Sequence, residues 1–460
     1  MAKLFGTDGM RGEAGRFPLD ARTVRVAGRS LARHLAARSE RSGNSPRIVT
    51  GRDTRESGAW IEDEFIAGAR EAGAEVQSAG VITTPGVAYL ARVLPADAGV
   101  VISASHNPYQ DNGIKIFSPS GRKLDDATER LIEADIEAEE GDSKVEAQIS
   151  PHMPPVEEEL ERHAAALRAR YLNFLVEDIG QGLSLEGFRL VADCANGAAF
   201  ELAPALFERL GAKVIALNDT PDGRNINRDC GSLHIKGLRM RVMEERASLG
   251  VAFDGDADRA LFVDARGSFV DGDATLWVMA KYLDERGQLE GRAVVSTVMS
   301  NIGLETALRS KGMSLVRADV GDKYVLEELL RTGAAIGGEQ SGHLIFPRLS
   351  LAGDGMMTTL CVLRAMRESG SSLEELTEGF KRFPQVLVNV RVREKRPFEE
   401  VEDIARAARE TEGRLGESGR LLLRYSGTEP LARVMIEGER QDLIERYAND
   451  LASVIERALG

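Results

Sequence analysis

The sequence predicts an α/β protein in which three mixed α/β units of related topology precede a smaller C-terminal α+β unit. Short β-rich segments alternate with helical patterns over roughly the first 370 of the 460 residues, which is typical of βαβ units with mainly parallel sheets. Several strands run from apolar or small residues into loops rich in Ser, Asp, Asn, Gly and Glu. The clearest are GVVISASHNP, RLVADCANGA, GVAFDGDADR, AVVSTVMSNIG and AAIGGEQSGH. Ligands bind beyond the carboxyl ends of strands in open α/β sheets, so these loops predict the functional site.

Changes in composition predict where the units meet. Between Glu137 and Glu161 the chain becomes charged and contains prolines, which indicates a linker and a boundary near residue 153. Further boundaries are predicted near residue 258, just after the DGDADR segment, and near residue 372. The predicted domains are therefore 1–153, 154–258, 259–372 and 373–460. In the last one, FPQVLVNVRV, RLLLRYSGTEP and ARVMIEGE predict strands, and QDLIERYANDLASVIERAL predicts an amphipathic helix.

Charge and composition exclude several classes of function. The chain has 59 Lys and Arg against 73 Asp and Glu, a net charge of −14, and its basic residues are dispersed among acidic ones. No nucleic-acid partner is expected, and any phosphate must be bound locally. Because no apolar run approaches a membrane span of about 18 residues and the N-terminus lacks a signal peptide, we expect a cytoplasmic protein without a membrane partner. The cysteine and histidine spacings predict neither disulfides nor a zinc site, so a metal site should be built from oxygen.

The segment SASHNPYQDNGIKIF, from Ser103 to Phe117, is the first candidate for chemistry. A serine beside a histidine, followed by Asn-Pro and Asn-Gly turn signals, is typical of a nucleophile on an exposed loop. A turn-rich connection without function is the alternative. No GxSxG nucleophile elbow is present, so acyl transfer has no local support.

The segment FDGDADRA carries three aspartates at two-residue spacing: Asp254, Asp256 and Asp258. In an extended segment these side chains point to one side, where a hard divalent cation would offset their repulsion. An EF-hand is excluded because Arg259 and Ala265 occupy the positions that need Gly and Glu. The segment therefore predicts a Mg²⁺ site that also uses substrate oxygens, with an acidic turn as the alternative.

The segment GGEQSGH combines Glu339, Ser341 and His343 on one loop. A carboxylate near a hydroxyl suits recognition of vicinal sugar hydroxyls, because Glu accepts two hydrogen bonds and Ser both donates and accepts. The alternative is a glycine-rich turn with a surface histidine.

The segment RYSGTEPLARVMIEG places five candidate phosphate ligands in and around one turn: Arg424, Ser426, Gly427, Thr428 and Arg433. Guanidinium groups, hydroxyls and amides freed by glycine form a compact cradle for a phosphate dianion. A β-hairpin with incidental arginines is the alternative. Arg11 in FGTDGMRG is a further candidate contact, whereas no GxxxxGK[ST] or Rossmann GxGxxG motif supports a kinase or dehydrogenase.

Taken in order, FGTDGMRG, SASHNP with DNGIK, DGDADR, GEQSGH and RYSGTEP resemble the α-D-phosphohexomutase superfamily over essentially the whole chain. The resemblance implies four domains around a central cleft, each contributing one motif. Within the superfamily, VADCANGA, TVMSNIGLE and YSGTEPLARVMIEG are most similar to bacterial members that act on glucosamine phosphates. One departure is Ala257, where members often have glycine.

The resemblance also implies roles for individual residues. Ser105 carries the phosphoryl group and, with Asp254, Asp256 and Asp258, holds one Mg²⁺. The remaining catalytic residues implied are His106, Lys115, Arg11, Arg259 and His343, of which Lys115 and His343 match proton-handling positions. Glu339 and Ser341 would bind sugar hydroxyls, and the RYSGTEP residues with Arg433 would bind the phosphate that is not transferred.

The implied reaction interconverts glucosamine 6-phosphate and glucosamine 1-phosphate through glucosamine 1,6-bisphosphate, which is both activator and intermediate. The product would lead to UDP-N-acetylglucosamine and the cell wall, and the protein would be a monomer or homodimer with a phosphosugar as its only expected partner. A phosphomannomutase/phosphoglucomutase with the same mechanism is the nearest alternative. A metal-dependent phosphatase acting through phosphoserine and a catalytically silent sugar-phosphate sensor are the others.

Overall fold

The computed structural model describes residues 4–6, 8–38, 45–140, 157–426 and 429–460. It divides into two compact units. One contains the chain up to Val298 together with Val316–Glu378, and the other contains Met299–Leu315 and Gly379–Gly460. The boundary predicted near residue 153 and most of the predicted linker lie outside the described residues.

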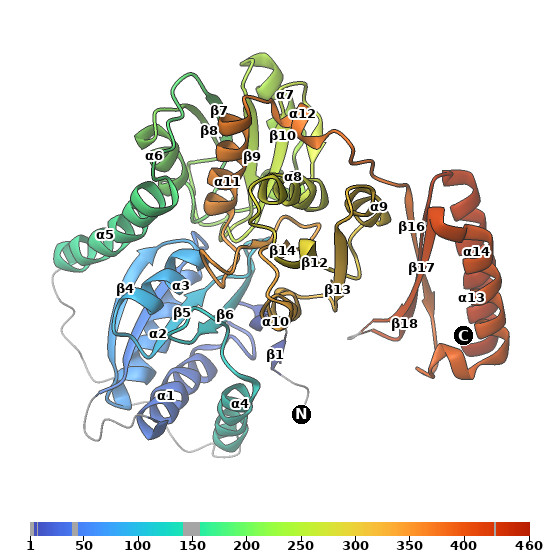
Figure 1. The fold of residues 1–460 in the computed structure, drawn as a ribbon. Helices are drawn as coiled ribbons and strands as arrows, with labels where there is room; N and C mark the ends of the chain where they lie inside the picture. Colours follow the sequence, from blue (N-terminus) through green and yellow to red (C-terminus); the bar gives the residue numbers. More distant parts are fainter. Residues whose placement is uncertain (1–3, 7, 39–44, 141–156, 427–428) are drawn as a thin grey trace. The chain divides into compact units, whose positions relative to one another are not determined.

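The first sheet carries the serine loop (Figure 1). Its strands, in spatial order, are β1 (Phe5–Gly6), β2 (Gly9–Glu13), β6 (Asp111–Phe117), β5 (Ala98–Ile102), β3 (Arg47–Arg52) and β4 (Glu75–Val81). The associated helices are α1 (Ala21–Arg38), α2 (Gly58–Glu71), α3 (Thr84–Val93) and α4 (Asp126–Glu140). β5 (AGVVI) is buried along its whole length, as expected of a continuous apolar run in a sheet covered on both faces. The serine loop begins at Ser103, directly after the carboxyl end of β5.

The second sheet carries the three aspartates. Its order is β11 (Phe269–Val270), β10 (Ala260–Asp264), β9 (Leu249–Phe253), β7 (Arg189–Asp193) and β8 (Lys213–Leu217). The accompanying helices are α6 (Leu202–Arg209), η2 (Gly231–Leu233) and α7 (Lys236–Glu244), whereas α5 (Glu157–Asn173), which continues into η1 (Phe174–Ile179), packs against β4 and α3 of the first sheet. β7, β8 and β9 are parallel, whereas β10 pairs antiparallel with β9. The sheet thus extends past residue 258, because the chain reverses at the aspartate turn and returns alongside β9.

The third sheet has the order β13 (Ser314–Ala318), β12 (Ala293–Thr297), β14 (Gly337–Gly338) and β15 (Leu344–Ile345). The helices of this region are α8 (Gly272–Glu285), α9 (Ile302–Ser310), α10 (Asp322–Thr332), α11 (Gly355–Ser369) and α12 (Leu373–Thr377), with η3 at Glu290–Arg292. β12 and β14 are parallel, and the GEQSGH loop connects β14 to its antiparallel partner β15. The strand-to-loop pattern predicted from the sequence is confirmed for β5, β7, β9, β12 and β14.

The C-terminal sheet is antiparallel, with β18 (Leu431–Gly438) between β16 (Gln385–Arg391) and β17 (Gly419–Tyr425). α13 (Glu402–Leu415) and α14 (Gln441–Leu459) cover one of its faces, and η4 (Phe398–Glu400) and η5 (Gly416–Ser418) are short turns (Figure 1). α14 is amphipathic as predicted: Ile444, Leu451 and Ile455 are among its buried residues. Each such side chain contributes about 1.5 to 3 kcal/mol by leaving water.

These sheets confirm the predicted fold class, three α/β regions and a smaller α+β region. Among the described helices, none combines the length with the apolar composition that a membrane crossing requires.

Candidate active site

The serine loop follows β5 and places Ser105 under the aspartates of the second sheet. Ser105 Oγ donates a hydrogen bond to Asp254 Oδ2 at 2.5 Å and lies 3.3 Å from His106 Nδ1. The expectation of an exposed serine is wrong, because Ser105 is only 1% exposed. A loop from another sheet covers it, which the local sequence does not reveal.

The aspartates converge on a turn. Their carboxylates each offer an oxygen within 4.8 Å of the others, so the predicted convergence is present. The predicted extended conformation is wrong: the N–H of Ala257 donates to the carbonyl of Asp254 at 3.1 Å, which closes a turn. Ala257 has φ of 54°, a left-handed conformation that favours glycine, and this explains why glycine would suit the position better.

The triad Asp254, Asp256 and Asp258 is electrostatically suited to a cation. Burial raises the pKa of Asp254, and the charges of Asp258 and Asp256 raise it further. Burial alone would also raise the pKa of Asp258, but Lys115 and His343 lower it overall. Asp256 Oδ1 and Asp258 Oδ1 are buried without a hydrogen-bond partner among the described residues. Two buried carboxylate oxygens without a hydrogen-bond donor, in an all-oxygen cluster, fit a hard divalent ion such as Mg²⁺.

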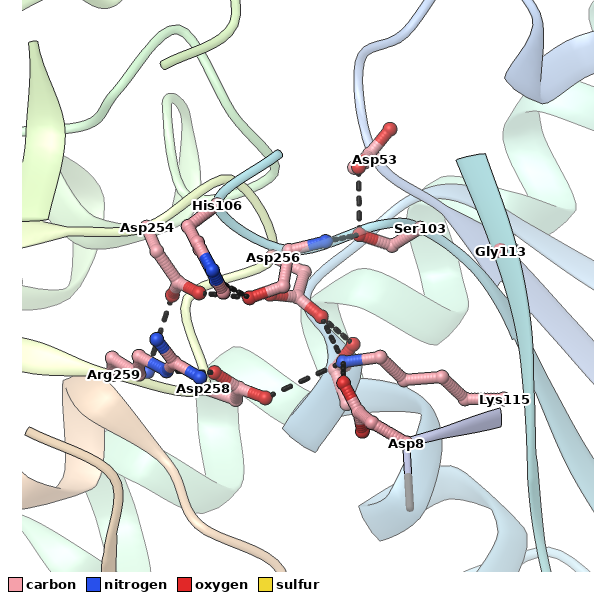
Figure 2. A network of polar contacts seen from close by, with 12 residues as sticks. Asp8, Asp53, Ser103, His106, Gly113, Lys115, Asp254, Asp256, Asp258 and Arg259 are labelled. Carbon is pink, nitrogen blue, oxygen red and sulfur yellow. Dashed lines mark hydrogen bonds and ion pairs between the residues drawn. The ribbon is translucent and has the colours of Figure 1, made fainter. Parts of the chain in front are cut away.

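Lys115, on β6, supplies positive charge to this cluster (Figure 2). Its Nζ lies 2.8 Å from Asp256 Oδ2 and 3.4 Å from Asp258 Oδ2. Burial alone would lower the pKa of Lys115, but the carboxylates, led by those of Asp256 and Asp8, raise it overall. Lys115 is therefore a buried cation in this structure.

The two histidines of the site differ in charge. Burial, with help from Arg259 and Arg11, lowers the pKa of His106 to about 4, so this ring is neutral near pH 7. Burial would also lower the pKa of His343, but Asp258 and Asp322 raise it to about 9. The alternative of a surface histidine in GGEQSGH is wrong, since His343 is buried.

Six side chains form a closed ring in which positive and negative charges alternate. In order around the ring they are Asp8, Lys123, Asp322, His343, Asp258 and Lys115. The nitrogen–oxygen distances between consecutive members are 2.6, 2.7, 3.8, 3.6, 3.4 and 3.3 Å. The ring joins β6 and the loop after it to α10, the aspartate turn and the GEQSGH loop. It also lines one side of a cavity of about 390 Å³.

The GEQSGH loop is held against the aspartate turn. The N–H of Ala260 donates to the carbonyl of Gly342 at 3.1 Å, which links the two loops directly. Glu339 accepts from the N–H of Gly321 at 3.2 Å and from Ser341 Oγ at 3.1 Å. The structure thus places the predicted sugar-binding residues beside the predicted metal site.

The two predicted arginines of this unit flank the aspartates. The N–H of Arg259 donates to Asp254 Oδ1 at 3.2 Å, and Arg259 Nε lies 3.8 Å from Asp258 Oδ1. Arg11, on β2, forms an ion pair with Asp8. Both add positive charge near the serine loop, since each lowers the pKa of His106.

The predicted phosphate hairpin lies in the C-terminal unit and is described by itself. Arg424 on β17 and Arg433 on β18 are directly opposite each other in the sheet. Like charges in that position are destabilising, so the pair favours an anion between or beside them. Burial and the charge of Arg433 lower the pKa of Arg424. Ser426 Oγ accepts from Arg433 at 3.4 Å, while Gly427 and Thr428 lie outside the described residues.

Comparison with known proteins identifies the family. Four domain models of phosphoglucomutase/phosphomannomutase match residues 2–142 (domain I), 169–267 (domain II), 271–383 (domain III) and 387–454 (C-terminal domain). The chain belongs to the phosphoglucomutase/phosphomannomutase family. The phosphoglucosamine mutase of Solibacter usitatus is 49% identical over 466 residues, covering 100% of both chains. That of Syntrophotalea carbinolica is 46% identical over 460 residues, covering 100% of this chain and 98% of the relative.

A solved structure shares the fold of this family member. It is a phosphoglucomutase/phosphomannomutase family protein from Burkholderia thailandensis, with a TM-score of 0.78 and 23% identity over 99% of this chain and 97% of that one. At this identity the likeness concerns the fold alone.

Four residues that surround the reactive groups of this mutase-family site were not predicted. Arg55 and Asn227 bind the carbonyls of the serine loop, Asp53 binds both Arg55 and Ser103, and Thr84 donates to Asp256 Oδ2 at 2.5 Å. Asp53 and Arg55 follow the carboxyl end of β3, a position that could have signalled them. Thr84 likewise follows the carboxyl end of β4, whereas Asn227 carries no comparable signal in the sequence.

Replacing Gly353 with alanine is expected to displace His343 without removing it. A Cβ atom at Gly353 would lie 2.3 Å from His343 Nε2, and the ring must move to relieve the overlap. We expect kcat for phosphosugar isomerisation to fall roughly 10- to 100-fold, because small misplacements of a catalytic group have effects of that size. Gly237→Ala on α7, where a Cβ meets nothing within 4 Å, is the matched control. Unchanged kinetics in Gly353→Ala would show that the reaction does not depend on the position of the His343 ring.

Replacing Arg424 with alanine is expected to weaken phosphosugar binding. A charge-assisted hydrogen bond contributes about 1.5 to 3 kcal/mol, which corresponds to a rise in Kd of roughly 10- to 100-fold. Some loss of kcat should accompany it, since remote binding energy also stabilises the transition state. Calorimetric titration with the substrate measures the change, and Arg409→Ala on the exposed face of α13 is the control. An unchanged Kd would exclude Arg424 from the phosphate cradle.

Proposed function

We propose that this chain is a phosphoglucosamine mutase, which interconverts glucosamine 6-phosphate and glucosamine 1-phosphate through phosphorylated Ser105 and glucosamine 1,6-bisphosphate. The observation that carries the proposal is the position of Ser105 Oγ, 2.5 Å from one of three buried, convergent aspartates. The names of the relatives, which match over the whole chain, favour the amino sugar over the phosphomannomutase/phosphoglucomutase alternative.

Asp254, Asp256 and Asp258 would hold Mg²⁺ together with an oxygen of the Ser105 phosphoryl group. When bound, the ion would draw negative charge from that group and make it a better phosphoryl donor. Lys115, Arg259 and Arg11 add fixed positive charge around the same position. Lys115 need not reorganise during transfer, because its aspartate partners already hold it in place.

The proposed cycle uses two opposite transfers at one serine. Ser105 donates its phosphoryl group to the free hydroxyl of the sugar phosphate, and the bisphosphate then returns its other phosphoryl group to Ser105 after turning around. His106, neutral and 3.3 Å from Ser105 Oγ, is placed to exchange a proton with it. The raised pKa values of Lys115 and His343 favour their charged forms, so both supply positive charge. In each transfer the proton lost by the attacking hydroxyl balances the proton gained by the oxygen that gives up the phosphoryl group.

Sugar recognition is assigned to two separate groups of residues. Glu339 and Ser341 would bind sugar hydroxyls, and their mutual hydrogen bond of 3.1 Å keeps both polar groups on one side of the loop. Arg424, Ser426 and Arg433, with Gly427 and Thr428, would bind the phosphate that is not transferred.

Parallel turnover assays on glucosamine, glucose and mannose 1-phosphates test the proposal. We expect kcat/KM for the glucosamine compound to exceed the other two at least roughly tenfold, the effect of one well-placed polar contact. A clear preference for a neutral sugar would support the phosphomannomutase/phosphoglucomutase alternative. Release of inorganic phosphate without isomer exchange would indicate a phosphatase, and no reaction with any substrate would favour a sensor.

A further inference from the structure

We propose that Arg55 and Asn227 are positioning residues that hold the Ser105 backbone in the conformation that phosphoryl transfer requires. The inference rests on the proposed function for its kinetic consequence, whereas its structural consequence can be measured independently. Within the described part of the chain, the two side chains, called here the Arg55–Asn227 clamp, make no hydrogen bond to the residues predicted to bind the sugar or its phosphate.

Arg55 uses its whole guanidinium group to hold the serine loop. Its Nε donates to Asp53 Oδ2 at 2.9 Å, one terminal nitrogen donates to the carbonyls of Pro108 and, at 3.0 Å, Asp111, and the other donates to those of Ser105 and Asn107, both at 2.9 Å. The guanidinium has five N–H donors, and each has an acceptor here. The side chain is fully buried. A lysine, with three donors on a single nitrogen, cannot reproduce this pattern.

Asn227 binds the same loop from the second sheet's side. Its Nδ2 donates to the carbonyl of Ser105 at 2.9 Å and to that of Asn107 at 3.1 Å. The backbone N–H of Asn227 donates to the carbonyl of Ala195, in the loop that follows β7. Asn227 thus ties the serine loop to the domain that carries the aspartates.

Ser105 needs such support because its backbone is strained. Its φ of 52° is in the left-handed region, which non-glycine residues adopt only when surrounding contacts impose it. The N–H of Ser105 donates to Ser103 Oγ at 2.9 Å, and its carbonyl accepts from both clamp residues. Side chains therefore hold both backbone polar groups of Ser105.

The consequence for chemistry follows from the direction of the Ser105 side chain. In the strained conformation Oγ is 2.5 Å from Asp254 Oδ2. Relaxation to a negative φ would rotate the Cα–Cβ bond and carry Oγ away from the triad. Because the clamp acts on the serine and leaves the sugar contacts intact, its loss should lower kcat with little change in KM.

The test compares Arg55→Lys and Asn227→Ala with wild type and with Arg52→Lys, a control at the end of β3 whose side chain pairs with Glu62. Hydrogen–deuterium exchange of the peptide covering residues 103–111 reports the loop directly, and steady-state kinetics report the reaction. We expect exchange in this peptide to rise roughly tenfold and kcat to fall roughly 10- to 100-fold in both variants, with KM within about twofold. Because Arg55→Lys keeps the positive charge, a defect in this variant would be due to the lost geometry of the guanidinium group and not to a lost charge.

Several outcomes would overturn the inference. Wild-type exchange in both variants would show that the loop does not depend on the clamp, and a rise in KM at constant kcat would place these residues in substrate binding. If Arg55→Lys fails to fold, Asn227→Ala, which removes only two side-chain hydrogen bonds to the loop, decides alone. Wild-type protein without isomerase activity would refute the proposed function, while the exchange measurement would still accept or reject the clamp.

Discussion

Replacing Ser105 with alanine is expected to abolish isomerisation, with kcat reduced by at least roughly 10³-fold, because the reaction loses its phosphoryl carrier. The folded state should lose little. The hydroxyl contacts Asp254 and His106, and removing one hydrogen bond to a charged acceptor costs about 1.5 to 3 kcal/mol at most. Because the three crowded carboxylates repel one another, we expect the loss of folding free energy to lie near the lower end of this range. Alanine also matches the buried volume closely.

Intact mass and kinetics together measure this effect. Wild type incubated with the sugar bisphosphate should gain one phosphoryl group, and Ser105→Ala should gain none. Ser120→Ala, an exposed serine in the loop after β6, controls for non-specific phosphorylation. Full turnover by Ser105→Ala would refute the assignment of the phosphoserine and with it the proposed mechanism.

The sequence predicts those parts of the site that consist of short motifs at the ends of strands. Strands β5, β9 and β14 each end in a polar loop, and the rule that such ends gather ligands places Ser105, Asp254 and Glu339 in one region. The same patterns do not reveal burial. The turn-rich segment around Ser105 predicts an exposed serine. In the structure Ser105 is buried, because the aspartate turn of another sheet packs over it. Local conformation was also missed at Ala257, because alternation in sequence suggests a strand where the chain turns.

The roles of the supporting residues could not be predicted because these roles arise from tertiary contacts. Asp8, Lys123 and Asp322 complete the ring of alternating charges, yet Lys123 and Asp322 are 199 residues apart and lie in no recognised motif. Arg55 and Asn227 meet at the carbonyl of Ser105 from different sheets. Every residue has a backbone carbonyl, so the residue type at position 105 does not indicate that its carbonyl will accept a hydrogen bond from an arginine elsewhere in the chain.

The triad should oppose folding of the metal-free protein and favour folding once a cation is bound. Three buried carboxylates with oxygens within 4.8 Å of one another repel, and Lys115 offsets only part of this charge. Asp254→Asn removes one charge: its single amide oxygen can still accept from the N–H of Arg259, and its NH₂ group can donate to Ser105 Oγ, which accepts as well as donates. We therefore expect the metal-free variant to be as stable as wild type or more stable, by about 1 kcal/mol.

The sign of the effect reverses when Mg²⁺ is added. At a Mg²⁺ concentration about 100 times Kd, the metal should stabilise wild type by about 2.7 kcal/mol, whereas Asp254→Asn should show little response and no measurable turnover. Thermal or denaturant unfolding with and without Mg²⁺ gives this comparison without any activity assay, and Asp219→Asn, exposed in the same domain, is the charge-matched control. A variant that keeps the Mg²⁺-dependent rise would exclude Asp254 as a ligand. One that loses more than about 2 kcal/mol without metal would instead show that the carboxylate is needed for folding, because repulsion within the triad would then be smaller than the hydrogen bonding it supports.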